Sequence, residues 1–163
     1  MWTVVDSPVG ELRLVEHEGD LTAIEFSPFA EPDAPGSGPA RGPRDDEHPV
    51  LVRAREQLAA YFAGDLTEFD LPLAPRGTPW QQSVWEQLRA IGYGETSSYG
   101  QVAARLGRTN AASRAVGLAN GRNPIPIVIP CHRVVGADGT LTGYAGGLER
   151  KQVLLRLEQR GLF

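Results

Sequence analysis

The stretch SYGQVAARLGRTNAASRAVGLA, residues 98–119, has the pattern of two short helices joined by a glycine-containing turn. Ser98 is followed three residues later by a glutamine, the spacing of a capping box, and the helix that starts there should end at Gly107. Asn110 is placed to cap a second helix over residues 111–119. Together the two helices predict a helix-turn-helix, a motif of moderate specificity because many helical hairpins bind nothing.

The second of these helices is unusual because almost all of its side chains are small. Its small residues are Ala111, Ala112, Ala115, Gly117 and Ala119. Close helix–helix packing is one explanation of that composition. The other is that the bare surface lets the long cation of Arg114 enter a nucleic-acid groove, and we favour it because the features below agree with it.

Outward from this motif, the only cysteine of the chain, Cys131, lies in the stretch IPCHRV, residues 129–134. A lone thiol forms no internal disulfide, and a free cysteine is most often a small buried hydrophobe. Here the apolar run of residues 125–129 predicts a buried strand, and Pro130 should end it, which presents Cys131 at a strand end. The neighbouring histidine and cations are features that lower a thiol's pKa from about 8.5, so we interpret Cys131 as a nucleophile.

Composition and charge are consistent with a globular protein that has a polyanionic partner. The 163 residues are 41% hydrophobic and 22% charged, without an apolar run long enough for a membrane span or a secretory signal. The net charge of −4 is unevenly divided: residues 1–75 carry 5 arginines and 15 acids, a net −10, whereas residues 76–163 carry a net +6. A basic half that also holds the candidate nucleophile points to nucleic acid, although an excess of six charges is also compatible with an ordinary solvated surface.

The residues before position 76 predict a small β-rich unit. Short strands are expected at residues 3–5, 12–15 and 21–26. Residues 27–49 contain six prolines, so we expect a flexible loop there, followed by a helix over 49–63 and an extended linker over 65–77. This division predicts two domains, residues 1–75 and 76–163.

The second domain should begin and end with amphipathic helices. Thr78, Pro79 and Gln81 form a strong helix start, and the two tryptophans at 80 and 85 should anchor that helix in the core. A final helix is expected over residues 149–160.

Several motifs of the second domain resemble the O6-alkylguanine-DNA alkyltransferase family, also called methylated-DNA–protein-cysteine methyltransferases. In order along the chain they are Ser98-Tyr99, Ser113-Arg114-Ala115-Val116-Gly117, Asn123-Pro124, Ile129-Pro130-Cys131-His132-Arg133-Val134 and Gly143-Tyr144-Ala145-Gly146-Gly147. The match covers about residues 76–160. The resemblance implies an α+β fold, in which a small N-terminal ribonuclease-H-like α/β domain precedes a mainly helical C-terminal domain with a DNA-binding helix-turn-helix.

The function that this resemblance implies is DNA repair by direct reversal of damage. Members take a methyl or alkyl group from O6 of guanine, and by extension O4 of thymine, onto their own cysteine. They bind duplex DNA through the minor groove and rotate the damaged nucleotide into a pocket, because the reacting atom cannot be reached inside the base stack. The thioether product is stable, so transfer should be irreversible and stoichiometric, as in a suicide enzyme.

The resemblance also assigns catalytic roles. Cys131 matches the nucleophile, His132 the residue that accepts the thiol proton through a water, and Glu158 the carboxylate that orients the histidine. Tyr99 matches the tyrosine that donates to N3 of the base. From the sequence pattern alone, Glu158 would be an ordinary surface glutamate of an amphipathic helix. Only the match to the family assigns it a catalytic role.

Substrate and DNA contacts follow from the same match. Tyr144 and the backbone N–H of Ala145 match groups that bond to O6, and the carbonyls of Cys131 and Val134 match acceptors for the guanine amine. Asn123 matches a structural asparagine that joins the helix-turn-helix to the active-site strand. Arg114 matches the finger that replaces the extruded base, and Ser113, Ala115 and Gly117 belong to the same DNA-binding helix. Arg133 should join an internal polar network.

The chain departs from some relatives at two points. Ala145 stands where some members carry serine, and the cysteines with which some members bind zinc are missing, so we predict no metal and no cofactor. The partner should be double-stranded DNA that contains O6-alkylguanine. We expect no association with a membrane. We expect a cytoplasmic protein that is a monomer in solution, and the sequence leaves open whether monomers cluster along DNA.

Three alternatives compete with this interpretation. A non-catalytic damage binder, like the alkyltransferase-like proteins, would lack the cysteine. A cysteine hydrolase would use Cys131 and His132 but would leave Arg114 and the helix-turn-helix without a role. A transcription factor would account for the helices and leave Cys131 unexplained.

Overall fold

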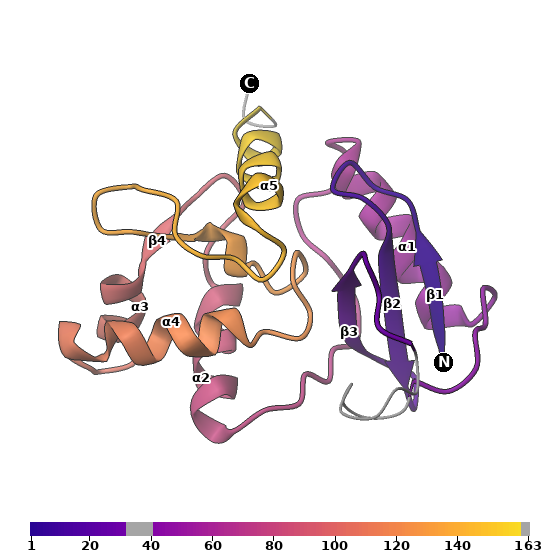
Figure 1. Cartoon of the computed structure of the whole chain (residues 1–163), viewed down its shortest axis with the longest axis horizontal. Coiled ribbons are helices and arrows are strands. Elements are labelled where there is room, and N and C mark those ends of the chain that lie inside the picture. Colours follow the sequence, from indigo (N-terminus) through magenta and orange to yellow (C-terminus); the bar gives the residue numbers. More distant parts are fainter. Residues whose placement is uncertain (32–40, 161–163) are drawn as a thin grey trace. The chain divides into compact units, whose positions relative to one another are not determined.

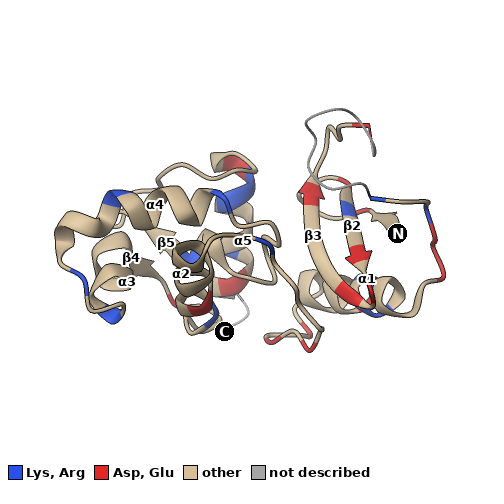
Figure 2. Cartoon of the chain, turned by 90° about the horizontal axis from the view of Figure 1, so that it is seen from below, with Lys and Arg blue, Asp and Glu red and all other residues tan. Residues whose placement is uncertain are grey.

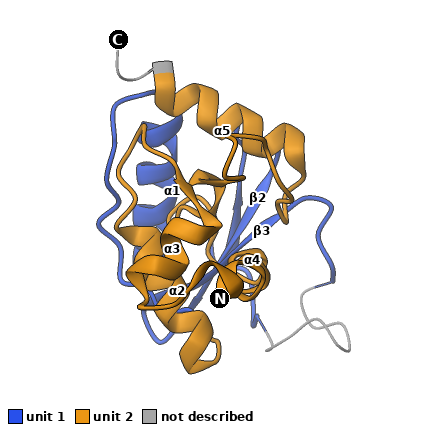
Figure 3. Ribbon diagram, turned by 90° about the vertical axis from the view of Figure 1, so that its left-hand side faces the viewer, with its two compact units in different colours: residues 1–75 blue, residues 76–163 orange. Residues whose placement is uncertain are grey.

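The computed structural model describes residues 1–31 and 41–160, without the side chain of Arg160 (Figure 1). It divides into two compact units, Met1–Pro75 (unit 1) and Arg76–Phe163 (unit 2), which Figure 3 shows in separate colours. Unit 1 combines a small sheet with one helix, and unit 2 is mainly helical. The predicted α+β class is therefore confirmed.

Unit 1 is a three-stranded antiparallel sheet covered by one helix. Its elements are β1 (Trp2–Val5), β2 (Leu12–His17), β3 (Asp20–Phe26) and α1 (Pro49–Phe62), and the strand order is β1-β2-β3. Leu12 and Leu14 alternate along β2 and are fully buried, as are Leu51 and Tyr61 of the helix. The alternating apolar residues of the strands and the apolar stripe of the helix thus form one core.

A half-buried carboxylate fastens the segment that begins at Arg41 to this sheet. Glu25 of β3 accepts hydrogen bonds from Arg13 Nη2 at 2.9 Å and from Arg41 Nε at 2.6 Å. Burial alone would raise the pKa of Glu25, but these two guanidinium groups lower it below its ordinary value. Of the expected flexible loop over 27–49, residues 32–40 lie outside the described residues. Residues 41–48 form coil and turns, in which Arg41 is buried and ion-paired and Arg44 bridges to β1.

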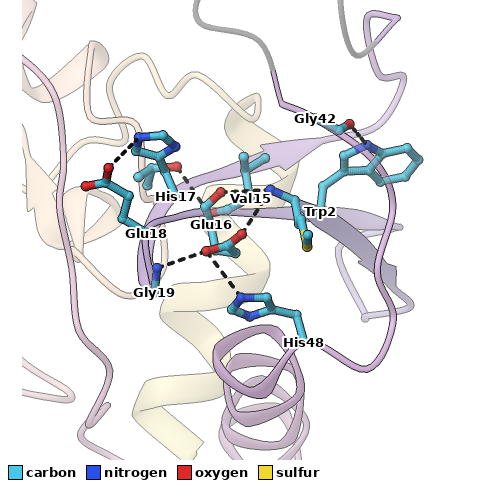
Figure 4. Close-up of polar contacts among 10 residues, drawn as sticks. Trp2, Val15, Glu16, His17, Glu18, Gly19, Gly42 and His48 are labelled. Atoms are coloured by element: carbon cyan, nitrogen blue, oxygen red, sulfur yellow. Dashed lines mark hydrogen bonds and ion pairs between the residues drawn. The ribbon is translucent and has the colours of Figure 1, made fainter.

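A second carboxylate of unit 1 joins β2 to the start of α1 (Figure 4). The side chain of Glu16 accepts from the Met1 amino group and from the Gly19 backbone N–H, both at 3.0 Å. His48 Nε2, from the residue that precedes α1, lies 3.5 Å from the same carboxylate. The Glu16 carboxylate therefore links the N-terminus, the turn after β2 and the residue before α1.

Unit 2 is built from short helices around a minimal parallel sheet. Its elements are α2 (Pro79–Arg89), β4 (Ser97–Ser98), α3 (Tyr99–Arg105), the 3₁₀ turn η1 (Asn110–Ala112), α4 (Ser113–Gly121), the 3₁₀ turn η2 (Cys131–Arg133), β5 (Val134–Val135) and α5 (Leu148–Arg160). Both predicted capping boxes are confirmed, at Thr78 for α2 and at Ser98 for α3. The prediction that Asn110 caps the second helix is wrong: α4 begins at Ser113, and Asn110 lies in η1, where its side chain accepts from the Ser113 hydroxyl.

The predicted strand over residues 125–129 is also wrong. The segment forms buried turns, with Ile127 in the left-handed region at φ 74°. Asn123 holds them closed, because its Oδ1 accepts from the Ile125 N–H at 3.0 Å and its Nδ2 donates to the Ile129 carbonyl at 2.8 Å. An apolar run reports burial, and here the backbone bonds are satisfied inside the turn by a side chain instead of by a neighbouring strand.

Candidate active site and nucleic-acid interface

Cys131 opens the turn η2 and is almost completely buried, with 3% of its surface exposed. Its N–H donates to the Ile129 carbonyl at 2.8 Å. Its own carbonyl accepts two hydrogen bonds, one from the Val134 N–H and one from Asn120 Nδ2 at 3.3 Å. The backbone of Cys131 is therefore fixed by three hydrogen bonds.

The environment of the Cys131 thiol differs from the expectation of a lowered pKa. Burial raises the pKa of the thiol to about 11, although a hydrogen bond from Asn123, the charge of Lys151 and a hydrogen bond from Tyr144 act in the opposite direction. The sequence-based expectation is thus wrong for this structure. A thiol in this state is protonated at neutral pH, so its reaction requires a base that removes the proton.

The next residue, His132, is a candidate for this base and belongs to a buried network of polar side chains. His132 Nε2 lies 2.7 Å from Glu158 Oε2, and Arg133 binds the same carboxylate through Nε at 2.8 Å and Nη2 at 3.0 Å. Burial lowers the pKa of His132, and we therefore assign a neutral ring whose Nε2–H donates to Glu158. Burial alone would raise the pKa of Glu158, but the bonds from His132 and Arg133 lower it to about 2. Arg133 belongs to the internal network, as expected.

The tautomer of His132 determines which of its ring nitrogens can accept a proton. Because Nε2 is occupied by Glu158, the second ring nitrogen, Nδ1, is the one that can accept a proton. Nδ1 is buried and has no hydrogen-bond partner among the residues that the structure describes. The pair therefore has the arrangement of a base and the carboxylate that orients it.

Lys151 is a buried cation of this site that sequence reasoning missed. It is 0% exposed, and its Nζ donates to the Val134 carbonyl at 2.6 Å and to the Thr142 carbonyl at 3.2 Å. No described carboxylate forms an ion pair with it, and burial lowers its pKa. One signal was available in the sequence, because Lys151 stands three and seven residues before the buried Leu154 and Glu158, on the inner face of α5.

A loop between β5 and α5 forms another wall near the thiol. Tyr99 and Thr142 share a hydrogen bond between their hydroxyls, and Thr142 is in turn bound through its carbonyl to Lys151. Tyr144 is half-buried and acts to lower the pKa of the thiol, whereas Ala145 is exposed. Six of the predicted site residues therefore lie around Cys131. Five are Asn123, His132, Val134, Tyr144 and Glu158. The sixth, Tyr99, is linked to the site through Thr142.

Helix α4 presents a bare exposed face that carries Arg114. Val116 and Ala119 are buried toward the core, while Arg114, Ala115 and Leu118 are exposed. Figure 2 shows the basic residues along this part of the ribbon. Arg114 forms no ion pair with any described residue, and such a cation is available to a phosphate or a base.

The inner side of α4 explains part of its composition. A Cβ on Gly117 would lie 3.6 Å from the Tyr99 ring, so the helix runs close to that tyrosine. Two tryptophans of α2 donate to its carbonyls, Trp80 Nε1 to Ala115 at 3.3 Å and Trp85 Nε1 to Ala119 at 2.8 Å. Close packing therefore accounts for the small residues that face inward, and Ser113 and Ala115 lie at the end that carries Arg114.

No group of three or more His, Cys, Asp or Glu side chains could hold a metal ion within residues 1–31 and 41–160. No described helix has both the length and the apolar character needed to cross a membrane.

Comparison with known proteins gives the same family for both units. The family model described as "6-O-methylguanine DNA methyltransferase, DNA binding domain" matches residues 79–160, and the one described as "6-O-methylguanine DNA methyltransferase, ribonuclease-like domain" matches residues 1–75. A methylated-DNA–protein-cysteine methyltransferase of Mycolicibacterium paratuberculosis is 52% identical over 160 residues, which are 98% of this chain and 92% of the relative.

Solved structures give the same result. The crystal structure of a Mycobacterium tuberculosis O6-methylguanine methyltransferase superposes with a TM-score of 0.86 at 49% identity, covering 98% of this chain and 92% of that one. A crystal structure of the M. tuberculosis protein in complex with DNA matches with a TM-score of 0.84 at 46% identity, covering 98% of this chain and 93% of that one.

Proposed function

This chain belongs to the 6-O-methylguanine DNA methyltransferase family, and we propose that it repairs DNA by moving an alkyl group from O6 of guanine to the Cys131 thiol. The reaction also extends to O4 of alkylated thymine. The observation that carries the proposal is the buried 2.7 Å contact between His132 and Glu158, next to the only cysteine of the chain.

The thiol proton and the alkyl group change places in this reaction. The Cys131 sulfur attacks the alkyl carbon, the bond from that carbon to guanine O6 breaks, and a thioether forms. His132 takes the thiol proton through Nδ1, and Glu158 stabilises the resulting imidazolium. The proton then neutralises the departing guanine, so the products are alkylated protein and unmodified base.

Negative charge develops on the guanine as the bond to O6 breaks, and this charge must be neutralised. Tyr99 donates to N3, and Tyr144 with the Ala145 N–H donates to O6, which lowers the energy of the leaving group. The Val134 carbonyl and Asn123 hold the other side of the site, the first against the base and the second at the turn before Cys131. Their positions around the thiol support these roles.

DNA is bound through α4 and the helix-turn-helix. Arg114 enters the duplex in the place of the extruded nucleotide, and the small exposed residues beside it let the helix approach the minor groove. The complex of the M. tuberculosis relative with DNA supports this partner.

Each molecule acts once, since the chain has one cysteine and a thioether is too stable to be hydrolysed back to the thiol. The thiol must stay reduced until it meets a lesion. We therefore place the protein in a reducing compartment, the cytoplasm.

The test is incubation of the protein with a duplex that contains O6-methylguanine labelled in the methyl group. One label per molecule should become bound to protein, and peptide mass spectrometry should find it on Cys131. Cys131→Ser should bind the same duplex and take up no label. Label on this variant, or label that maps to another residue, would refute the assignment.

A further inference from the structure

Thr142, in the loop between β5 and α5, connects two parts of the site that come from different elements. Its side-chain hydroxyl shares a hydrogen bond with the Tyr99 hydroxyl, at the start of α3. Its carbonyl accepts a hydrogen bond from Lys151 Nζ of α5 at 3.2 Å. One half-buried residue of the loop therefore contacts both the tyrosine and the buried cation of the site.

Lys151 extends this connection to the backbone of Cys131. Its Nζ also donates to the Val134 carbonyl at 2.6 Å, and the Val134 N–H donates to the Cys131 carbonyl. A continuous series of hydrogen bonds thus leads from the Tyr99 hydroxyl through Thr142, Lys151 and Val134 to the residue that carries the thiol. Buried polar networks of this kind make a site rigid, so the loop holds the tyrosine in place relative to the nucleophile.

The other contacts of Tyr99 fix its backbone and its ring but not the direction of its O–H. The backbone follows directly on the capping box of Ser98. The ring lies against α4, where a Cβ on Gly117 would be 3.6 Å from Tyr99 Cε1. The hydroxyl hydrogen can still turn, because it rotates to suit its partners. Among the residues that the structure describes, Thr142 is the one that hydrogen-bonds this hydroxyl.

We propose that Thr142 is a positioning residue for alkyl transfer, and that in the complex its hydroxyl donates to the Tyr99 oxygen so that the Tyr99 O–H points to N3 of the extruded base. This inference rests on the proposed function and deepens it. A hydroxyl that accepts one hydrogen bond becomes a stronger donor in the next, because successive bonds polarise one another. Thr142 therefore strengthens the bond that Tyr99 makes as negative charge develops on the base.

Thr142→Val tests this role because it removes the hydroxyl and keeps both the shape of the side chain and the carbonyl that binds Lys151. Single-turnover repair of duplex O6-methylguanine is measured over a range of protein concentrations, which separates the maximum rate from the concentration that gives half of it. The maximum rate should fall about fivefold, the effect of one hydrogen bond, while the half-maximal concentration stays unchanged.

Two further variants control for the substitution itself. Thr142→Ser, which restores a hydroxyl, should recover most of the lost rate. Thr140→Val makes the same change at an exposed position of the same loop, where the hydroxyl bonds to Asp138, and it should keep the wild-type rate. If Thr142→Val does not fold, Thr142→Ala provides the same comparison.

Double variants with Tyr99→Phe separate positioning of the tyrosine from a structural role of the loop. Once the Tyr99 hydroxyl is absent, Thr142→Val should cause no further loss of rate, because the two substitutions then remove the same interaction. A fivefold loss in both backgrounds would overturn the proposal, and so would a wild-type rate in Thr142→Val alone.

Iodoacetamide shows whether the thiol itself is affected, because the chain has one cysteine and the reagent needs no alkylated base. Cys131 should react at the same rate in Thr142→Val and in the wild type, since the carbonyl of residue 142 still binds Lys151. A slower reaction in the variant would place the effect on the nucleophile and overturn the proposal. Failure of the wild-type protein to take up a methyl group from the duplex would remove the proposed function as well, whereas the outcomes above that concern Thr142 leave that function intact.

Discussion

In unit 1, Glu25 accepts hydrogen bonds from Arg13 and Arg41, whereas in unit 2 Glu158 accepts them from Arg133 and His132. In each cluster two nitrogen-containing side chains bind one carboxylate. They differ in one respect, because an arginine keeps its charge at any ordinary pH and a histidine can gain or lose a proton. The first cluster can only hold segments together, while the second can also take a proton from a neighbour.

The cations of the two units differ in the same way. In unit 1 the arginines at 13, 41, 44 and 53 are each ion-paired with a described carboxylate. In unit 2, Arg114 on the surface and Lys151 in the interior have none. Arg114 is therefore available to a polyanion and Lys151 to the charge of the thiol, whereas Arg133 of the same unit is held by Glu158.

The largest effect should come from removing the charge of the carboxylate at the centre of each cluster. Glu158→Gln should slow alkyl transfer by about 10³-fold, because His132 loses the group that orients it and stabilises its charged form. Glu25→Gln should leave the transfer rate unchanged while lowering the free energy of unfolding. Single-turnover rates and urea denaturation of both variants measure the two effects, and a comparable loss of rate in Glu25→Gln would break the distinction between the clusters.

Acid should also weaken the cluster of Glu158. Its pKa is lowered from 4.5 to about 2 in the folded protein, so the folded state favours the charged form. The resulting stability is fully present above pH 4.5 and is lost as the pH falls through 2, and it amounts to roughly 3 kcal/mol for a shift of this size.

Urea denaturation between pH 7 and pH 2.5 measures this dependence. The wild-type protein should lose stability on acidification below pH 4.5, and Glu158→Gln should show a smaller slope over that range. Glu25→Gln serves as the matched variant from unit 1, where the pKa is also lowered. An identical slope in the wild type and in Glu158→Gln would mean that other groups carry the acid sensitivity.

Local signals in the sequence predicted much of this fold. The helix starts at Thr78 and Ser98 were recognised because a capping box is made by residues three positions apart. The segment over 125–129 was predicted wrongly, since an apolar run gives burial but not backbone conformation, and the bonds of Asn123 that shape it are visible only in three dimensions. The strand that does lie beside Cys131 is Val134–Val135, which pairs with Ser97–Ser98, 37 positions earlier in the chain.

The candidate site shows the same limit. Cys131, His132 and Arg114 stand in motifs and could be singled out from the sequence. Lys151 resembles a surface residue of a charged helix, and only its burial against two carbonyls distinguishes it. The raised pKa of Cys131 could not be predicted either, because it depends on burial in the folded chain and on Asn123, Tyr144 and Lys151, which come from separate segments.

The exposed cation should matter on duplex DNA alone. Arg114→Ala should slow repair of duplex O6-methylguanine by roughly thirtyfold, because the extruded state loses the group that fills the stack. Reaction with free O6-benzylguanine should be unchanged. Arg122→Ala, an exposed arginine at the other end of the same helix, controls for loss of positive charge, and an equal loss on duplex in that variant would argue against a special role of Arg114.

The buried cation should have the smallest effect, and on both substrates. Lys151→Met should raise the pKa of Cys131 further, because the charge that favours the thiolate is removed while burial stays. One pKa unit corresponds to about a tenfold smaller thiolate fraction below the pKa, so transfer from free O6-benzylguanine at pH 7 should slow about tenfold. The other ionisable groups around the site, on η2, α5 and the loop of Tyr144, remain unchanged.

Reaction with iodoacetamide isolates the thiol in this experiment, because the chain has one cysteine and the reagent needs neither DNA nor a base. Lys151→Met should slow this reaction by a similar factor, and Arg156→Met, an exposed position on the same helix, should not change it. The carbonyls of Val134 and Thr142 also lose their donor, which should cost about 1–3 kcal/mol of stability. A variant that is destabilised but alkylates at the wild-type rate would show that Lys151 only holds the two carbonyls, and the unpaired cation would then belong with the structural charges of unit 1.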